Sequence, residues 1–226
     1  MLKETKKILV VAPHPDDETL GCGGTILKNK AAGNKICWLL ITSMEKEQGF
    51  SEERIQERER EIEKVSKEYG FDGVFRLNMP TKRLDTIPNE KIINAVSDVI
   101  NKVMPDTVFL PNRSDAHSDH KIVFDSAMSS LKTFRTPFVK KILVYETISE
   151  TEFGSAICGD VFVPNSFSDI TEFLDRKIAI MQIYKGELSQ HPFPRSPENM
   201  KALAVFRGAA AGVIYAEAFM LLKEIW

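Results

Sequence analysis

Short apolar runs separated by charged stretches set the plan of the chain. Residues 7–12 (KILVVA) and 36–42 (ICWLLIT) carry a single charge between them and are rich in β-branched and aliphatic side chains. Such continuous runs are typical of strands that are buried on both faces of a sheet. Shorter runs of the same kind predict further strands over residues 73–77, 107–110, 141–145 and 161–163.

Segments with helical spacing alternate with these strands. Residues 89–103 place apolar side chains three and four positions apart, which predicts an amphipathic helix. The strongly charged segment 51–69 also predicts a helix, with Ser51 as its N-cap and Gly70 as its end. Further helices are predicted over residues 19–32, 118–131, 168–185 and 197–211.

This alternation predicts an α/β fold of the Rossmann-like kind, in which helices cover both faces of a mostly parallel sheet. The 226 residues contain no internal repeat, low-complexity tract or long linker, so we expect one domain over residues 1–226. In such sheets, ligands bind at the carboxyl ends of the strands. Residues 13–24 and 111–120 leave strands at that edge and are rich in polar side chains. We therefore expect the functional site there.

Composition narrows the class of protein. Hydrophobic residues make up 43% and charged residues 27%, with a net charge of -2, which favours a globular domain and gives no sign of a nucleic-acid partner. The apolar runs 8–13 and 209–222 are too short for a signal-peptide core or a membrane span. Cys22, Cys37 and Cys158 show no paired spacing, which favours a reducing compartment. We expect a cytoplasmic protein.

Three of the chain's four histidines lie in the two polar loops. His14 is followed by Asp16 and Asp17, directly after the first predicted strand. His117 and His120 stand three residues apart at the start of a predicted helix, so they share one of its faces. Placement of these side chains at the ends of two strands of one sheet favours a shared site.

The residue types in these loops are those of a catalytic zinc site. Such a site typically has three protein ligands and a fourth position open for water. His14 and His120, with one carboxylate of the aspartate pair, supply that set. The other carboxylate can accept a proton from the water, and His117 can act as an acid or stabilise an oxyanion. We expect Zn2+ as the cofactor, and other divalent ions also suit such a site.

Each of these residues also has a structural explanation. The aspartate pair can cap the helix that follows, and two histidines three residues apart can be an ordinary surface pair. Asp119 can cap a helix or orient His117. Glu18 is expected to be structural, and His191 lies either in a surface loop or at the far side of the pocket.

The sequence APHPDDETLGCGGT, followed by HSDH, resembles the LmbE-like, PIG-L-type zinc N-deacetylases, which act mainly on substrates containing N-acetylglucosamine. The second motif differs from the usual His-Pro-Asp-His only in Ser118. The similarity extends to Arg58 and Glu61, and to residues 207–208 and 215–219. It therefore covers most of the chain.

The resemblance implies a role for each matching residue. His14, Asp17 and His120 would hold the metal, and Asp16 would be the general base that acts on a metal-activated water. His117 would stabilise the oxyanion or protonate the leaving amine.

Further family features concern the substrate and the assembly. Asp119 would tune the neighbouring histidine, and Arg58 would contact the substrate. The chain departs from the family at residues 79–81 (MPT), where many relatives have Phe-Pro-Asp, and this difference bears on sugar recognition. Family members are often trimers or hexamers, so a homo-oligomer is expected by analogy.

The sequence thus predicts a metal-dependent N-deacetylase of an N-acetylglucosamine-type substrate. Two other functions remain open. An amidase acting on a thiol conjugate or a natural-product intermediate would use the same metal set. A metal- or sugar-binding module without turnover would not need Asp16, and the complete set of acid and histidine side chains argues against it.

Overall fold

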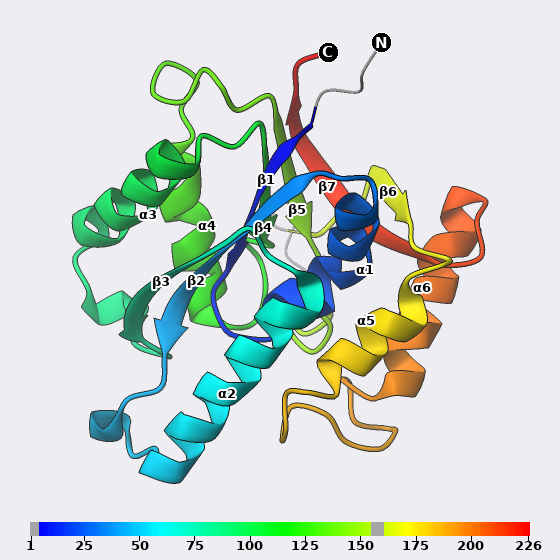
Figure 1. Cartoon of the computed structure of the whole chain (residues 1–226), viewed down its shortest axis with the longest axis horizontal. Helices are drawn as coiled ribbons and strands as arrows, with labels where there is room; N and C mark the ends of the chain where they lie inside the picture. The colour runs from blue at the N-terminus through cyan, green and yellow to red at the C-terminus, as the bar shows by residue number, and fades with distance from the viewer. Residues whose placement is uncertain (1–4, 155–160) are drawn as a thin grey trace.

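One seven-stranded sheet runs through the protein (Figure 1). The structure, a computed structural model, describes residues 5–154 and 161–226. The strand order is β3-β2-β1-β4-β5-β7-β6. In chain order the bounds are β1 Lys7–Ala12, β2 Lys35–Ser43, β3 Gly73–Pro80, β4 Thr107–Pro111, β5 Lys141–Tyr145, β6 Ser166–Asp169 and β7 Ala216–Glu224. The first five strands pair in parallel, and β7 pairs antiparallel with β5 and β6. The predicted α/β fold is confirmed.

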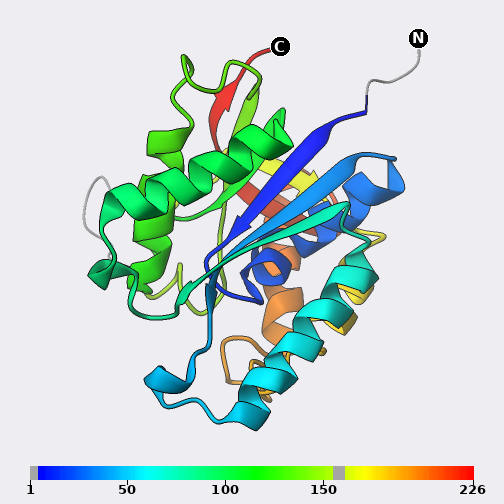
Figure 2. The ribbon, with the colours of Figure 1, turned by 60° about the vertical axis from the view of Figure 1, so that its left-hand side comes forward.

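Helices cover both faces of this sheet (Figures 1 and 2). α3 and α4 lie on one face, and α1, α2, α5 and α6 pack against the other. Two short 3-10 turns, η1 and η2, lie in the loops. The bounds are α1 Asp17–Ala31, η1 Lys46–Gln48, α2 Glu52–Tyr69, η2 Leu84–Thr86, α3 Asn89–Val103, α4 Ser118–Ser130, α5 Leu174–Met181 and α6 Pro197–Ala211.

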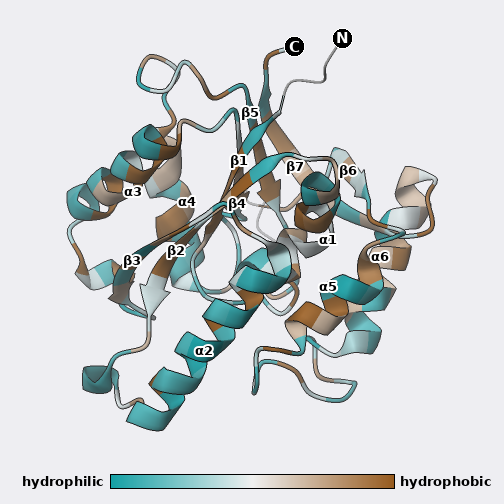
Figure 3. Ribbon diagram, in the orientation of Figure 1, coloured by the Kyte–Doolittle hydropathy of each residue, from teal (hydrophilic) through white to brown (hydrophobic). Residues whose placement is uncertain are grey.

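The central strand β1 divides the core into two layers. Ile8 and Val10 belong to the cluster on the α1 face, whereas Leu9 and Val11 belong to the cluster on the α3 face. Successive side chains of a strand point to opposite faces, so a strand covered on both sides is apolar throughout. The central strands are accordingly largely hydrophobic in Figure 3, while α2 is mostly hydrophilic.

Local signals placed the ends of α2 correctly. The Ser51 side chain accepts a hydrogen bond from the Arg54 amide, which makes it the N-cap. Gly70 ends the helix with φ of 64°, a left-handed conformation that glycine adopts without strain.

The predictions for residues 161–185 are partly wrong. Residues 161–163 form no strand, and β6 begins instead at Ser166. The predicted helix 168–185 is reduced to α5, because residues 166–169 pair with β7. Apolar side chains at helical spacing suggested one long helix, but tertiary pairing with a strand distant in sequence overrides that local preference. β7 itself was not predicted as a strand.

The described residues include two free cysteines and no membrane-spanning helix. Cys22 is buried and Cys37 is half-buried, while Cys158 lies outside the described residues. Across residues 5–154 and 161–226, every helix is too short or too polar to cross a membrane.

A buried carboxylate links β7 to α1. The α1 backbone departs from helical geometry at Cys22, so the next turn offers free amides. Glu217 Oε1 accepts a hydrogen bond from the Gly24 amide at 2.8 Å, and Oε2 accepts one from the Thr25 amide at 2.7 Å. Lys177 Nζ lies 2.7 Å from Glu217 Oε1 and is also buried. One side chain therefore joins a strand and two helices.

We expect Glu217→Ala to lower the free energy of unfolding by about 3–5 kcal/mol, because it leaves the Lys177 ammonium buried without its partner. Urea denaturation measures the change. Glu224→Ala on the same strand is the matched control, since that exposed carboxylate pairs with Lys141 at the surface and should contribute less than about 1 kcal/mol. Equal losses in both variants would contradict the assigned role.

Candidate metal centre

The two polar loops meet because β1 and β4 are neighbours. The strands pair in parallel, so their carboxyl ends lie at the same edge of the sheet. The loop after β1 leads into α1, and the loop after β4 leads into α4. The first loop is also held by β2, since the Thr42 amide and hydroxyl both donate to the Pro13 carbonyl.

His14, Asp17 and His120 form a group that could hold a metal ion. Asp17 Oδ2 lies 3.3 Å from His14 Nδ1 and 3.3 Å from His120 Nε2. Zinc ligands lie ~2.0–2.2 Å from the ion, so tetrahedral neighbours are separated by about 3.4 Å. The spacing of these atoms and their chemistry, two imidazole nitrogens and one carboxylate oxygen, both fit a zinc site.

Asp115 orients one of these ligands. Its Oδ2 lies 2.8 Å from His120 Nδ1, which leaves Nε2 facing Asp17. Its Oδ1 accepts hydrogen bonds from Asn112 and Thr151, so the carboxylate is itself fixed. Carboxylates commonly hold metal-binding histidines in this way. Sequence reasoning missed Asp115, although an acidic residue in the loop that carries the histidine pair was an available signal.

His14 also contributes to a second possible metal group, with His117 and Asp119. Asp119 Oδ2 lies 3.0 Å from His14 Nε2 and 3.9 Å from His117 Nδ1. The same carboxylate accepts hydrogen bonds from the amides of Lys82 and Leu84. Asp119 therefore has two backbone partners, whereas Asp17 Oδ2 accepts one amide hydrogen bond, from His14 at 2.8 Å, and lies 3.3 Å from a nitrogen of each of two imidazoles.

The electrostatics of the site favour a cation. Burial lowers the pKa of His14, but hydrogen bonds to Asp119 and Asp17 outweigh it and raise the pKa to about 9. Burial raises the pKa of Asp17, but His120 and His14 hold it well below its usual range. Burial and the neighbouring His14 lower the pKa of His117 to about 4. The carboxylates thus attract positive charge to the position between His14 and His120, and a metal ion can replace the protons there.

Asp16 lies beside this group in a strained conformation. Its φ of 130° is unusual for any residue other than glycine. It occupies the N-cap position of α1, but its side chain makes no capping hydrogen bond with the described residues. Burial and the nearby Asp17 raise the pKa of Asp16, and Arg195 opposes that effect. The Asp16 side chain therefore does not cap α1 through any described residue, in contrast to the structural explanation considered for the aspartate pair.

An arginine network surrounds Asp16. Arg195 Nη1 lies 3.2 Å from Asp16 Oδ2 and 3.2 Å from Glu187 Oε2. Arg58 also pairs with Glu187 and donates to the Pro15 carbonyl at 3.2 Å. Arg58 is buried, so it supports the backbone of the first loop. Arg195 and Glu187 lie before α6, far from the motifs, and no sequence pattern marked them.

A cavity of about 730 Å³ opens onto these residues. Its lining includes five of the six side chains predicted for the metal and the chemistry, together with Arg58. Asp119, which is buried, and His191, which is exposed, are not among the described lining residues. The lining set relevant here is His14, Asp16, Asp17, His117, His120, Arg58, Glu187 and Arg195.

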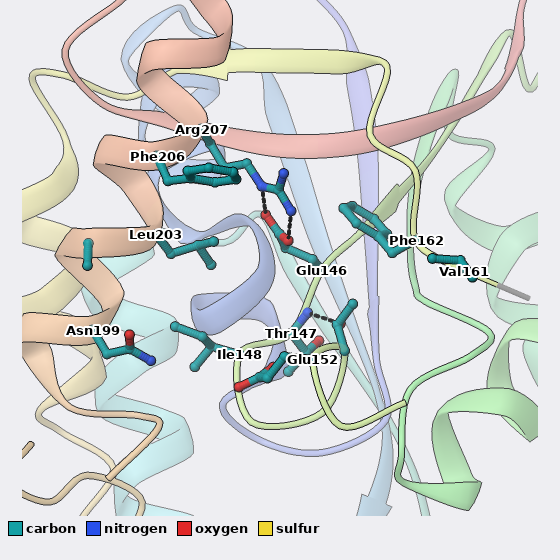
Figure 4. A pocket seen from close by; sticks show the side chains of 12 residues that line it. Glu146, Thr147, Ile148, Glu152, Val161, Phe162, Asn199, Leu203, Phe206 and Arg207 are labelled. Carbon is teal, nitrogen blue, oxygen red and sulfur yellow. Dashed lines mark hydrogen bonds and ion pairs between the residues drawn. The ribbon is translucent and has the colours of Figure 1, made fainter. Parts of the chain in front are cut away.

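A second pocket of about 510 Å³, shown in Figure 4, shares Thr147 with this cavity. Figure 4 shows the paired Arg207 and Glu146 side chains beside apolar residues such as Phe162 and Leu203. The described residues that line it include no histidine. The 730 Å³ cavity is therefore the candidate site for metal chemistry.

Comparisons with known proteins show what this chain is similar to. Residues 9–131 match the family PIG-L, described as GlcNAc-PI de-N-acetylase. The diacetylchitobiose deacetylase of Thermococcus kodakarensis is 24% identical over 230 residues, covering 99% of this chain and 85% of that protein. The uncharacterised deacetylase YaiS of Escherichia coli is 27% identical over 187 residues, covering 80% and 91%. A probable N-acetyl-α-D-glucosaminyl L-malate deacetylase of Bacillus cereus is 22% identical over 191 residues, covering 80% and 84%.

Solved structures share the fold. The N,N'-diacetylchitobiose deacetylase of Pyrococcus horikoshii superimposes with a TM-score of 0.78 and 22% identity, covering 97% of this chain and 85% of that one. The 4-carboxy-2-hydroxymuconate hydratase GalB of Pseudomonas putida gives a TM-score of 0.77 and 18% identity, covering 98% of each chain. Because a hydratase has this fold as well, the reaction has to be argued from the site.

We expect Asp115→Asn to weaken zinc binding by about 10- to 100-fold, because His120 loses the carboxylate that orients it. Competition with a chromophoric chelator measures the affinity. Asp98→Asn removes an exposed carboxylate on α3 and is the matched control. An Asp115→Asn variant with the affinity of the unmodified protein would rule out this role.

Proposed function

The chain belongs to the PIG-L family, and on that premise we propose that it removes the acetyl group from the amide nitrogen of an N-acetylglucosamine-type substrate. Its homologues are deacetylases, two of which are named for acetylated sugar substrates. The observation that carries the proposal is the position of Asp17 Oδ2, at 3.3 Å from a nitrogen of both His14 and His120, inside a cavity that also contains Asp16.

We propose that His14, Asp17 and His120 hold the metal. The support is the fit of their donor atoms and the fixed orientation of His120 on Asp115. A bound zinc ion, or another divalent ion, would polarise the substrate carbonyl and lower the pKa of water towards ~7.

Asp16 is the proposed general base. Its carboxylate is buried beside the ligand set, where it can take a proton from the attacking water. It can then deliver that proton to the nitrogen as the carbon–nitrogen bond breaks, which releases acetate and a free amine. Arg195 Nη1, 3.2 Å from Asp16 Oδ2, holds the carboxylate in place.

His117 is proposed to stabilise the oxyanion. Its Nδ1 accepts a hydrogen bond from the Asp119 amide, so the neutral ring carries its proton on Nε2. An N–H group that lines the cavity can donate to the carbonyl oxygen as negative charge develops there. Asp119 thus tunes the ring through its main chain, and Arg58 is proposed to contact the substrate at the cavity wall.

The sequence also gives expectations about the domain, the cellular location and the oligomeric state, and we include them in the proposal. We propose one deacetylase domain over residues 1–226, a cytoplasmic location, and a homo-oligomer such as a trimer or hexamer. The unbroken sheet, to which strands from both halves of the chain contribute, supports the single domain.

The zinc-loaded protein should release amine from at least one member of a panel of N-acetylated sugars. We expect Asp16→Asn to lower kcat by about 10²- to 10⁴-fold while keeping one metal per chain, because only proton transfer is removed. Amine release and metal content are measured together, with Asp98→Asn as the matched control. Turnover of thiol conjugates alone would favour the amidase, and metal binding without turnover of any amide would favour a binding module.

We expect Arg195→Ala to lower kcat by about 10- to 100-fold with little change in KM or zinc content, because Asp16 loses the group that positions it. Arg195→Lys should recover part of the rate, since it restores the charge but not the planar contact. Arg176→Ala, which alters an exposed arginine of α5, is the control. An unchanged kcat in Arg195→Ala would show that Asp16 is held without it.

A further inference from the structure

Lys82 is joined to the metal centre through its main chain. Its amide donates a hydrogen bond to Asp119 Oδ2 at 2.7 Å, and that oxygen lies 3.0 Å from His14 Nε2. Its φ of 59° is left-handed, a conformation that a residue with a long side chain rarely adopts. The loop after β3 thus holds this lysine in a defined place at the cavity wall.

The other cations that line the cavity are paired with carboxylates. Arg54 and Lys185 each lie within 4 Å of Glu57, and Arg58 and Arg195 each lie within 4 Å of Glu187. Lys82 is exposed, and in the described part of the chain no carboxylate lies within ion-pair distance of its ammonium group. Lys82 is therefore the one lysine or arginine of the described lining whose charge no described carboxylate neutralises.

The surroundings of Lys82 leave that charge available. The residue that precedes it, Thr81, has a neutral side chain. Glu150, another charged residue of the lining, follows β5, and three strands separate β5 from β3 in the sheet. An anionic group inside the cavity would be attracted towards Lys82 and repelled from Glu150.

We propose that Lys82 binds a carboxylate or phosphate group on the part of the substrate that lies beyond the acetylated sugar. The inference rests on the proposed deacetylase function and narrows its substrate class. The protein then prefers N-acetylated amino sugars with an anionic substituent to neutral ones. A cavity of about 730 Å³ has room for such a substituent beside the sugar ring.

A pair of ligands of equal shape tests the charge alone. The carboxymethyl glycoside of N-acetylglucosamine carries one negative charge, and its carboxamidomethyl analogue carries none. Calorimetry on zinc-loaded Asp16→Asn protein measures binding without turnover. We expect about tenfold tighter binding of the carboxylate, as for a hydrogen-bonded ion pair in a partly enclosed site. N-acetylglucosamine 1-phosphate, compared with the methyl glycoside, provides the phosphate arm.

Variants of Lys82 test whether this residue causes the preference for the carboxylate ligand. In the same Asp16→Asn protein, Lys82→Met should abolish the preference, and Lys82→Glu should reverse it. Arg83→Met is the matched control, because Arg83 is equally exposed and adjacent but is not among the described lining residues. A carboxylate preference that survives Lys82→Met would assign the anion to the metal and overturn the inference. Equal binding of both glycosides by the Asp16→Asn protein would overturn it as well.

Turnover, measured separately on protein with Asp16 intact, distinguishes this inference from the deacetylase proposal. Amine release without a preference that depends on Lys82 keeps the deacetylase and rejects the anion site. Binding with that preference, but without amine release from either glycoside, keeps the anion site and rejects the deacetylase. If neither glycoside binds, both proposals fail.

Discussion

The parallel pairing of β1 with β4 is the constraint on which the candidate site depends. It brings the ends of two strands, about one hundred residues apart in the chain, to the same edge of the sheet. His14 and Asp17 come from one loop and His120 from the other. A metal group that needs all three can form only if these strands are neighbours. The apolar layers on both faces of β1, which exclude water from the strand pair, therefore support the site as well as the fold.

Charge balance around the site is achieved by side chains from several distant elements. Asp16 and Asp17 are adjacent and both buried, an arrangement that burial and mutual repulsion oppose. Histidines stabilise Asp17, whereas Arg195 stabilises Asp16 from the segment before α6. Glu187 in turn holds the arginine. The two carboxylates thus have different partners, which is the condition under which neighbouring acids can perform different tasks.

The fold alone does not identify the reaction, and the side chains at the carboxyl edge of the sheet limit which reactions are possible. A hydratase and several deacetylases share this architecture. What favours hydrolysis of an amide here is a group that could hold a metal, next to a buried acid and a histidine whose tautomer is set by a backbone amide. Recognition of the rest of the substrate is proposed to depend on the cavity wall, where Lys82 has no carboxylate partner among the described residues.

The sequence by itself determined the elements whose signals are local. Apolar runs and caps located β1, α2, α3 and α6, and the spacing of His117 and His120 at the start of α4 predicted that both reach one cavity. Only the tertiary structure decided which strands are neighbours, that residues 166–169 pair with β7 instead of extending a helix, and that Asp115 and Arg195 reach the site. Local propensity acts between residues a few positions apart. Strand pairing and ion pairs join segments that lie far apart in the chain, and such contacts produce no periodic pattern in the sequence.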